Sequence, residues 1–168
     1  SFIEGPFGQI HVRTAGDPGA AKPPLVLIHQ SPSSSVAFAT LMPLLARDRF
    51  IIAADTPGFG ESDQPAGFSD QSPPSIAEYA QAHSAVIDAF AVRGPFDVMG
   101  YFTGSKIAVE LALQRNAVSP GQARRLILFG APIYTPDELA AERATYAPDV
   151  YDWDAGHLTK WWAHLRRG

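Results

Sequence analysis

The sequence predicts an α/β fold in which helices flank a mostly parallel sheet, and two patterns carry that prediction. Short, unbroken apolar runs such as Leu25–Ile28 are typical of strands that are buried on both faces of a parallel sheet. Longer segments between these runs repeat their apolar residues at helical spacing. Alternating strands and helices indicate crossover connections, which leave neighbouring strands parallel.

The first expected strand covers residues 8–15 and ends at the turn Gly16-Asp17-Pro18-Gly19. The buried strands follow at residues 25–29, 50–54, 96–99 and 125–129. Helices are expected over about 36–46, 75–92 and 105–116, and a further one begins at Pro136. A loop rich in Gly, Pro, Ser and Asp covers residues 55–75. Loops of this length are usually functional or mobile.

Two local signals refine the helices. Pro43 interrupts the segment 36–46, because proline has no N–H for a helical hydrogen bond. Ser75 stands three residues before Glu78, which is the spacing of a capping box at a helix N-terminus. We therefore expect the helix of residues 75–92 to start at Ser75.

The composition excludes several classes of protein. The chain has 168 residues, of which 46% are apolar and 18% charged, a balance too apolar for a disordered chain. Its net charge of −4 disfavours nucleic acid, which usually binds a basic face. No apolar run approaches the roughly 18 residues of a membrane span. Cysteine is absent, which removes disulfides, thiolate metal sites and a cysteine nucleophile. We expect a protein of the cytoplasm with no membrane partner.

Three loops carry the motifs that bear on function. They are LVLIHQSP at residues 25–32, ADTPGFGESD at 54–63 and VMGYFTGS at 98–105. In order and spacing they resemble the α/β-hydrolase fold family, whose HG-x-P loop, D-x-P-G-x-G-x-S-D loop and G-x-S-x-G nucleophile elbow follow successive strands. The resemblance covers roughly residues 8–135. It implies hydrolysis of an ester, epoxide, halide or related bond in a small, fairly apolar molecule.

The resemblance places Phe102 at the nucleophile position of the elbow. Gly100 and Gly104 supply the small residues that so tight a strand-to-helix turn requires. A benzyl side chain has no lone pair and cannot form a covalent ester. Two alternatives follow: a hydrolase whose chemistry is lost or altered, or a pseudoenzyme that keeps the pocket and binds a ligand. Tyr101 is a candidate pocket residue whose hydroxyl could bind or protonate a substrate.

The resemblance also implies an oxyanion hole, with the backbone N–H groups of Thr103 and Ser31 as donors. A cis bond before Pro32 is expected there, since cis peptides are almost confined to X–Pro bonds. The loop reads His29-Gln30 in place of His-Gly. His29 is the structural histidine of this loop, and the Gln30 side chain could intrude into the site or donate a hydrogen bond to a substrate.

Other polar residues receive structural interpretations. Ser105, Thr103 and the serines of residues 31–35 are weakly supported alternative nucleophiles, and Ser105 is better explained by close packing. Asp55 is expected to accept backbone N–H groups of its own loop, which Glu61, Ser62 and Asp63 also order. The remaining histidines, His11, His83, His157 and His164, lack the context of a triad base, and His83 is assigned to packing or surface.

No cofactor or metal is implied. Gly58-Phe59-Gly60 is too short for a dinucleotide fingerprint, and no set of His, Asp and Glu has zinc spacing. A small-molecule substrate or ligand is the expected partner.

The chain changes character near residue 136, after which no further strand is expected. Residues 1–135 resemble the N-terminal part of the α/β-hydrolase core, and residues 136–168 the start of a helical cap or lid. Trp153, Trp161 and Trp162 fit either an aromatic lid or a buried seam. The family's acid and histidine lie downstream of the cap, so the chain is expected to be truncated there. Two partners are possible for such a chain: its own missing C-terminal half, or further copies of the same chain in a homo-oligomer.

Overall fold

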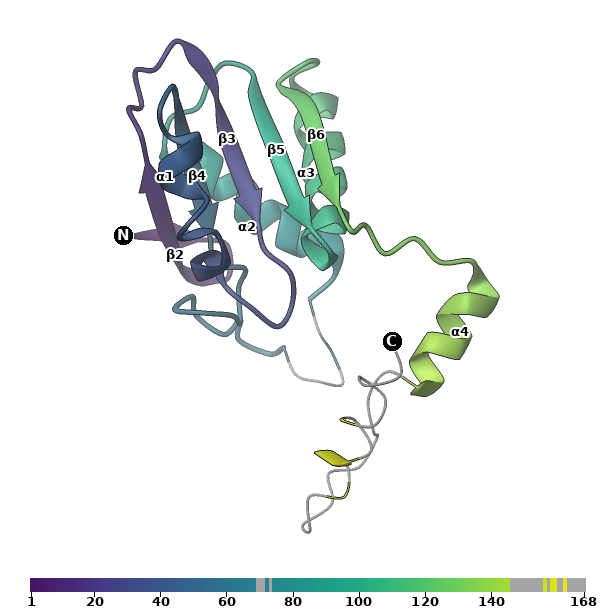
Figure 1. Ribbon diagram of the computed structural model, residues 1–168. Coiled ribbons are helices and arrows are strands. Elements are labelled where there is room, and N and C mark those ends of the chain that lie inside the picture. Colours follow the sequence, from purple (N-terminus) through teal and green to yellow (C-terminus); the bar gives the residue numbers. More distant parts are fainter. Residues whose placement is uncertain (69–71, 73, 146–155, 157, 160–161, 163–168) are drawn as a thin grey trace. The chain divides into compact units, whose positions relative to one another are not determined.

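The computed structural model describes residues 1–68, 72, 74–145, 156, 158–159 and 162. The chain divides into two units, Ser1–Pro132 and Ile133–Gly168. The first unit contains a six-stranded sheet of order β1-β2-β4-β3-β5-β6 (Figure 1). The strands are β1 (Phe2–Gly5), β2 (Gly8–Ala15), β3 (Lys22–Ile28), β4 (Arg49–Ala54), β5 (Phe96–Tyr101) and β6 (Ala123–Phe129).

The direction of the strands confirms the predicted mostly parallel sheet. The pairs β1–β2 and β2–β4 are antiparallel, whereas β3–β4, β3–β5 and β5–β6 are parallel. Strand β1 was not predicted. It has only four residues, its side chains alternate between exposed and half-buried, and it therefore lacks the apolar signal of the buried strands.

Helices lie on both faces of the sheet (Figure 1). Helices α2 (Ile76–Ala89) and α3 (Thr103–Val118) belong to the face that contains Val26 and Ile28. The 3₁₀ turn η1 (Ser35–Phe38) and the one-turn helix α1 (Met42–Leu45) belong to the face that contains Leu25 and Leu27. Strand β3 is thus buried on both faces, which explains why its run 25–28 has no polar residue.

The segment expected to be helical over residues 36–46 is interrupted, as predicted, and forms η1 and α1 separately. The interruption lies before α1 rather than at Pro43, so its predicted position is wrong. Pro43 lies in the first turn of α1, where its missing N–H leaves no helical bond unmade. Elsewhere the boundaries shift by a few residues. Ser75 and Glu78 form the expected capping box at the start of α2.

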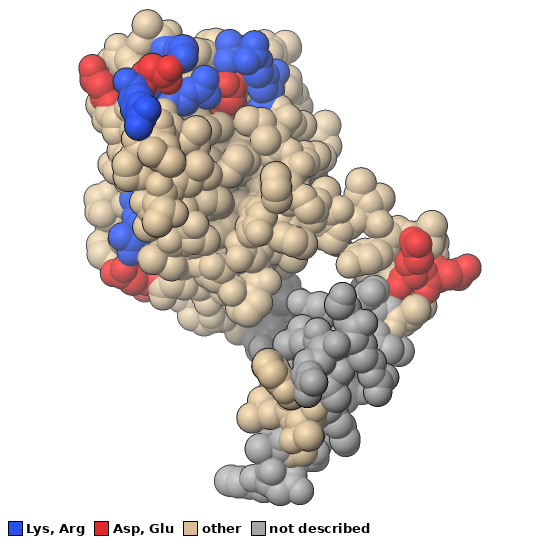
Figure 2. All heavy atoms as spheres, in the orientation of Figure 1, with Lys and Arg blue, Asp and Glu red and all other residues tan. Residues whose placement is uncertain are grey.

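Charged side chains gather at the amino ends of the parallel strands (Figure 2). There Asp97, at 2% exposure, accepts hydrogen bonds from Arg49 at 3.1 Å and from Arg124 at 2.8 and 2.9 Å. Burial alone would raise the pKa of the Asp97 carboxyl, but the arginine hydrogen bonds outweigh it and hold that pKa below its usual range. This cluster anchors the end of the sheet opposite the motif loops.

Strand β6 forms one edge of the sheet. Its consecutive residues Leu126, Ile127, Leu128 and Phe129 are 41–61% exposed. Successive strand residues point to opposite faces, so both faces of β6 are open in the described structure.

The second unit is described in part. Helix α4 (Pro136–Thr145) begins where predicted, and Thr135 caps it by accepting the Glu138 N–H at 3.3 Å. The cap assignment of residues 136–168 remains a prediction. Trp153, Trp161, His157 and His164 lie outside the described residues. Among the helices that are described, none is long and apolar enough to cross a membrane, and the cytoplasm stays a prediction from the sequence.

Candidate functional site

The motif loops meet where the connections of the sheet diverge. Strand β3 lies between β4 and β5; the chain leaves β3 toward β4 and leaves β5 toward β6. In α/β sheets such a switch point forms a crevice at the carboxyl ends of the strands. The register pairs Ile28 with Gly100, so the loop after β3 and the turn after β5 begin side by side.

The turn after β5 consists of a single residue. Phe102 has φ 49° and ψ −114°, a conformation that costs an L residue about 1–3 kcal/mol. Its N–H donates to the carbonyl oxygen of Phe129 at 2.8 Å, and its own carbonyl accepts the Ser105 N–H at 2.8 Å. The backbone is therefore held from β6 and from α3, while the side chain is 47% exposed. A strand, one strained residue and a helix are the geometry of a nucleophile elbow.

Small residues let α3 start against the neighbouring strand. A Cβ on Gly104 would lie less than 3.0 Å from the carbonyl oxygens of Ile28 and His29, and one on Gly100 would meet the backbone of Ser105 equally closely. The Ser105 hydroxyl donates to the Gly100 carbonyl at 2.9 Å. At 1% exposure, Ser105 has the packing role expected for it.

The second oxyanion donor expected from the sequence has an internal acceptor. The Ser31 N–H donates to Thr103 Oγ1 at 2.7 Å. The Thr103 N–H lies in the first turn of α3, where a helix offers no acceptor. The bond between Ser31 and Pro32 is cis, as expected. One of the two predicted donors, the Ser31 N–H, therefore already has an acceptor in the Thr103 hydroxyl. The oxyanion hole remains a prediction.

Replacing Thr103 by valine should release that donor. The variant removes the hydroxyl and keeps the branched shape, so we expect hydrogen exchange at the Ser31 amide to accelerate about 2- to 10-fold, the equivalent of one neutral hydrogen bond. Amide exchange followed by NMR measures the effect. Thr103→Ser is the matched control, since it retains the acceptor. Equal exchange rates in both variants would contradict the contact.

His29 joins two of the motif loops. Its Nε2 accepts the Thr56 N–H at 2.9 Å, so the ring proton must reside on Nδ1, which donates to the Gln30 carbonyl at 2.8 Å. Burial lowers the pKa of His29, which favours this neutral ring. The structural interpretation of His29 fits these contacts. Gln30 Oε1 is buried without a hydrogen-bond partner among the described residues.

His83 extends this buried polar group from α2. Its Nε2 lies 3.2 Å from Thr56 Oγ1, and the side chain is 1% exposed. Its Nδ1 has no partner in the part of the chain that is described. Burial, together with the nearby His29, lowers the pKa of His83 to about 3. Of the two roles expected for His83, packing is the one confirmed.

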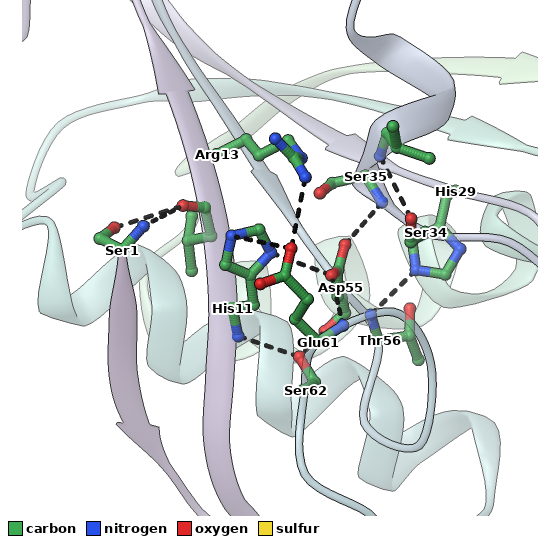
Figure 3. Close-up of polar contacts among 12 residues, drawn as sticks. Ser1, His11, Arg13, His29, Ser34, Ser35, Asp55, Thr56, Glu61 and Ser62 are labelled. Atoms are coloured by element: carbon green, nitrogen blue, oxygen red, sulfur yellow. Dashed lines mark hydrogen bonds and ion pairs between the residues drawn. The ribbon is translucent and has the colours of Figure 1, made fainter.

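Asp55 organises its own loop, as expected (Figure 3). Its carboxylate accepts hydrogen bonds from the Ser35 N–H at 2.6 Å and from the Glu61 N–H at 3.0 Å. It also lies 3.0 Å from His11 Nδ1, with which it forms a side-chain hydrogen bond. Burial would raise the pKa of the Asp55 carboxyl, yet these hydrogen bonds hold it below its usual range. Ser62 adds a bond from its hydroxyl to the Asp55 carbonyl at 2.7 Å. The contact with His11 was not predicted, because pairing between β2 and β4 brings these residues together.

A hollow of about 270 Å³ opens beside the Phe102 turn. It is lined by Ala37, Phe38, Leu41, Met99, Tyr101 and Phe129. The ring centroid of Tyr101 lies 4.8 Å from that of Phe102. Tyr101 therefore lines this hollow, and its role in binding a substrate remains a prediction. No group of three His, Cys, Asp or Glu side chains within the described ranges could hold a metal ion.

A mostly parallel sheet with an elbow turn at its switch point defines an α/β protein of the hydrolase type. The family model for the alpha/beta hydrolase fold matches residues 23–162, and the chain belongs to this family. This match confirms the predicted fold class and the resemblance to the α/β-hydrolase family.

Several curated relatives carry the names of hydrolases or dehalogenases. The chain is 34% identical over 128 residues to 2-hydroxymuconate semialdehyde hydrolase of Pseudomonas sp. (strain CF600), covering 71% of this chain and 40% of the relative. It is 30% identical over 134 residues to haloalkane dehalogenase 2 of Mycobacterium tuberculosis, covering 79% of this chain and 42% of the relative. The chain thus spans well under half the length of these relatives.

Solved structures share the fold. An N-acyl homoserine lactonase, AidH, complexed with N-butanoyl homoserine, has a TM-score of 0.65 at 21% identity over 95% of this chain and 64% of that one. The epoxide hydrolase CorEH has a TM-score of 0.67 at 20% identity over 87% and 50%.

Proposed function

We propose that this protein binds a small, largely apolar molecule at the carboxyl ends of β3 and β5 without forming a covalent intermediate there. The observation that carries the proposal is Phe102 at the elbow turn with φ 49°. In this interpretation Phe102 occupies the position where the family carries its nucleophile, and its benzyl ring offers no lone pair. The whole protein is then a pseudoenzyme of the α/β-hydrolase fold.

The neighbouring hydroxyl groups support the same interpretation. The Ser105 hydroxyl is buried and donates to the Gly100 carbonyl. The Thr103 hydroxyl accepts the Ser31 N–H, which fills part of the space that an oxyanion would need. Neither hydroxyl has a histidine as hydrogen-bond partner in the described structure, so neither resembles an activated nucleophile.

Hydrolysis by the whole protein is the second candidate function. The names of the relatives favour it, since they include a semialdehyde hydrolase and a haloalkane dehalogenase. Under this alternative the substrate is an ester, epoxide or halide of a small apolar molecule, and a group other than Phe102 activates the attack.

Intact-mass measurement after incubation with p-nitrophenyl butyrate tests the proposal in the full-length protein. We expect wild type to remain unmodified and Phe102→Ser to acquire a butyryl adduct, because serine restores a nucleophile on the same strained turn. Phe129→Ser is the matched control and should stay unmodified. An acyl adduct on wild type would reject the pseudoenzyme, and an unmodified Phe102→Ser variant would reject the nucleophile position.

Turnover separates the two candidate functions. Wild type should hydrolyse p-nitrophenyl esters no faster than Phe129→Ser. Turnover by wild type that is lost in Thr103→Ala would instead favour the second candidate.

A further inference from the structure

Three aromatic side chains stand together at the carboxyl ends of β5 and β6. The rings of Tyr101 and Phe102 meet edge to face, with an interplanar angle of 84°. The ring of Tyr101 lies 5.6 Å from that of Phe129. Phe102 and Phe129 are 47% and 61% exposed. Both rings therefore offer surface that the described chain does not cover.

The Phe102 ring packs directly against the backbone of Gly130. A Cβ on Gly130 would come within 3.1 Å of the ring carbons of Phe102, and Gly130 has φ 63°. Contacts with Gly130 and with the Tyr101 ring restrict the orientation of the Phe102 ring. A ring held in place before binding loses little side-chain entropy when a ligand stacks on it.

The adjoining hollow limits the size and charge of a ligand. Its volume of about 270 Å³ lies just below the roughly 300–1,000 Å³ of most ligand pockets, which suits a molecule with one ring. Its lining residues include Phe129 but not Phe102, and they are apolar apart from the Tyr101 hydroxyl. The exposed Phe102 ring lies next to the hollow, in contact with the ring of Tyr101. An ionised ligand would be left without a partner there, at a large desolvation cost. Charged side chains gather instead at the opposite end of the strands (Figure 2).

The Tyr101 hydroxyl is the polar group of this hollow. It makes no hydrogen bond with the residues that the structure describes. A ligand oxygen or nitrogen in the hollow would therefore be its natural partner.

We propose that the site selects a neutral ligand with a single flat ring, which stacks on Phe102 and Phe129 and hydrogen-bonds to the Tyr101 hydroxyl. The proposal rests on the proposed ligand-binding function and names the ligand class of the same site. In this proposal the residue at the nucleophile position of the elbow contacts the ring of a ligand and forms no covalent bond with it.

Calorimetric titration of the full-length protein with p-cresol and 4-methylcyclohexanol tests the flat ring. The two ligands share size and hydroxyl group and differ in aromaticity. We expect p-cresol to bind about 3- to 10-fold more tightly, the range measured for aromatic pairs. Phe102→Leu and Phe129→Leu should each reduce this preference. Phe2→Leu removes an exposed ring from β1 and should leave it unchanged.

The outcomes distinguish this inference from the proposed function. Equal affinity for both ligands would overturn the flat-ring selection and leave binding of small apolar molecules intact. Undetectable binding of both would reject the two proposals together. A preference that survives both leucine variants would also overturn the stacking role.

Tyr101→Phe tests the polar contact separately. It should weaken p-cresol binding about 2- to 10-fold, the value of one neutral hydrogen bond, and leave toluene binding unchanged. Equal losses for both ligands would show that the hydroxyl does not contact the ligand.

Discussion

Replacing Gly104 by alanine should lower the free energy of unfolding by about 3 kcal/mol or more, at the upper end of overpacking effects. The added methyl group would lie less than 3.0 Å from the carbonyl oxygens of Ile28 and His29. Those oxygens are backbone atoms at the end of β3, a central strand buried on both faces, so they cannot rotate away as a side chain would. Relief requires α3 to move away from the sheet, which would also disturb the Phe102 turn.

Urea unfolding measures the effect, and Gly94→Ala is its matched control. A Cβ at Gly94 would meet no atom within 4 Å, so the same chemical change should be nearly neutral there. Gly100→Ala should resemble Gly104→Ala, because its Cβ would meet the backbone of Ser105. If Gly104→Ala unfolds at the same urea concentration as Gly94→Ala, the close approach of α3 to β3 is refuted.

The same glycines explain how much of the site could be predicted. The spacing Gly100–Gly104 predicts a tight turn from the sequence, because only small residues allow a helix to start so close to a strand. The short apolar runs likewise predict the central strands. Backbone constraints of this kind leave a local signature that a single sequence displays.

Long-range side-chain contacts leave no such signature. The bond from Ser31 N–H to Thr103 Oγ1 joins residues 72 positions apart, and that between His11 and Asp55 joins residues 44 positions apart. Each depends on which strands become neighbours. The motif predicted that Ser31 and Thr103 would face one site, but it could not predict that a threonine hydroxyl would accept the donor. That hydroxyl supports the proposal of recognition rather than acyl transfer, which itself rests on Phe102 at the elbow turn.

Lowering the pH should begin to destabilise the fold near pH 6.5, well above the pH at which carboxylates titrate. Burial lowers the pKa of His29 from 6.5 and that of His83 to about 3. Below about pH 6.5 the unfolded chain protonates both rings, whereas the folded chain protonates each ring only at a lower pH. The stability is therefore complete above that pH and is lost as the pH falls. Each histidine contributes at most about 1.4 kcal/mol per pH unit.

Urea unfolding between pH 7 and 5 measures this slope. In this window the carboxyls of Asp55 and Asp97 contribute little to the slope. Because their pKa values are lowered in the folded protein, the stability that they contribute is lost only when the pH falls to about their ordinary pKa of 3.8 and below. His83→Gln keeps a polar partner for Thr56 and does not titrate, so its slope should fall by up to about half where both histidines act fully.

Gln81→His is the control for His83→Gln. Gln81 is exposed on α2, so a histidine there would titrate alike in the folded and unfolded chains and leave the slope unchanged. A wild-type slope close to zero between pH 6.5 and 5 would mean that the folded protein accepts protons on His29 and His83. The buried contacts of both histidines with Thr56 would then have to break when the rings become protonated. In that case these contacts could not hold the loop after β3 rigidly against α2.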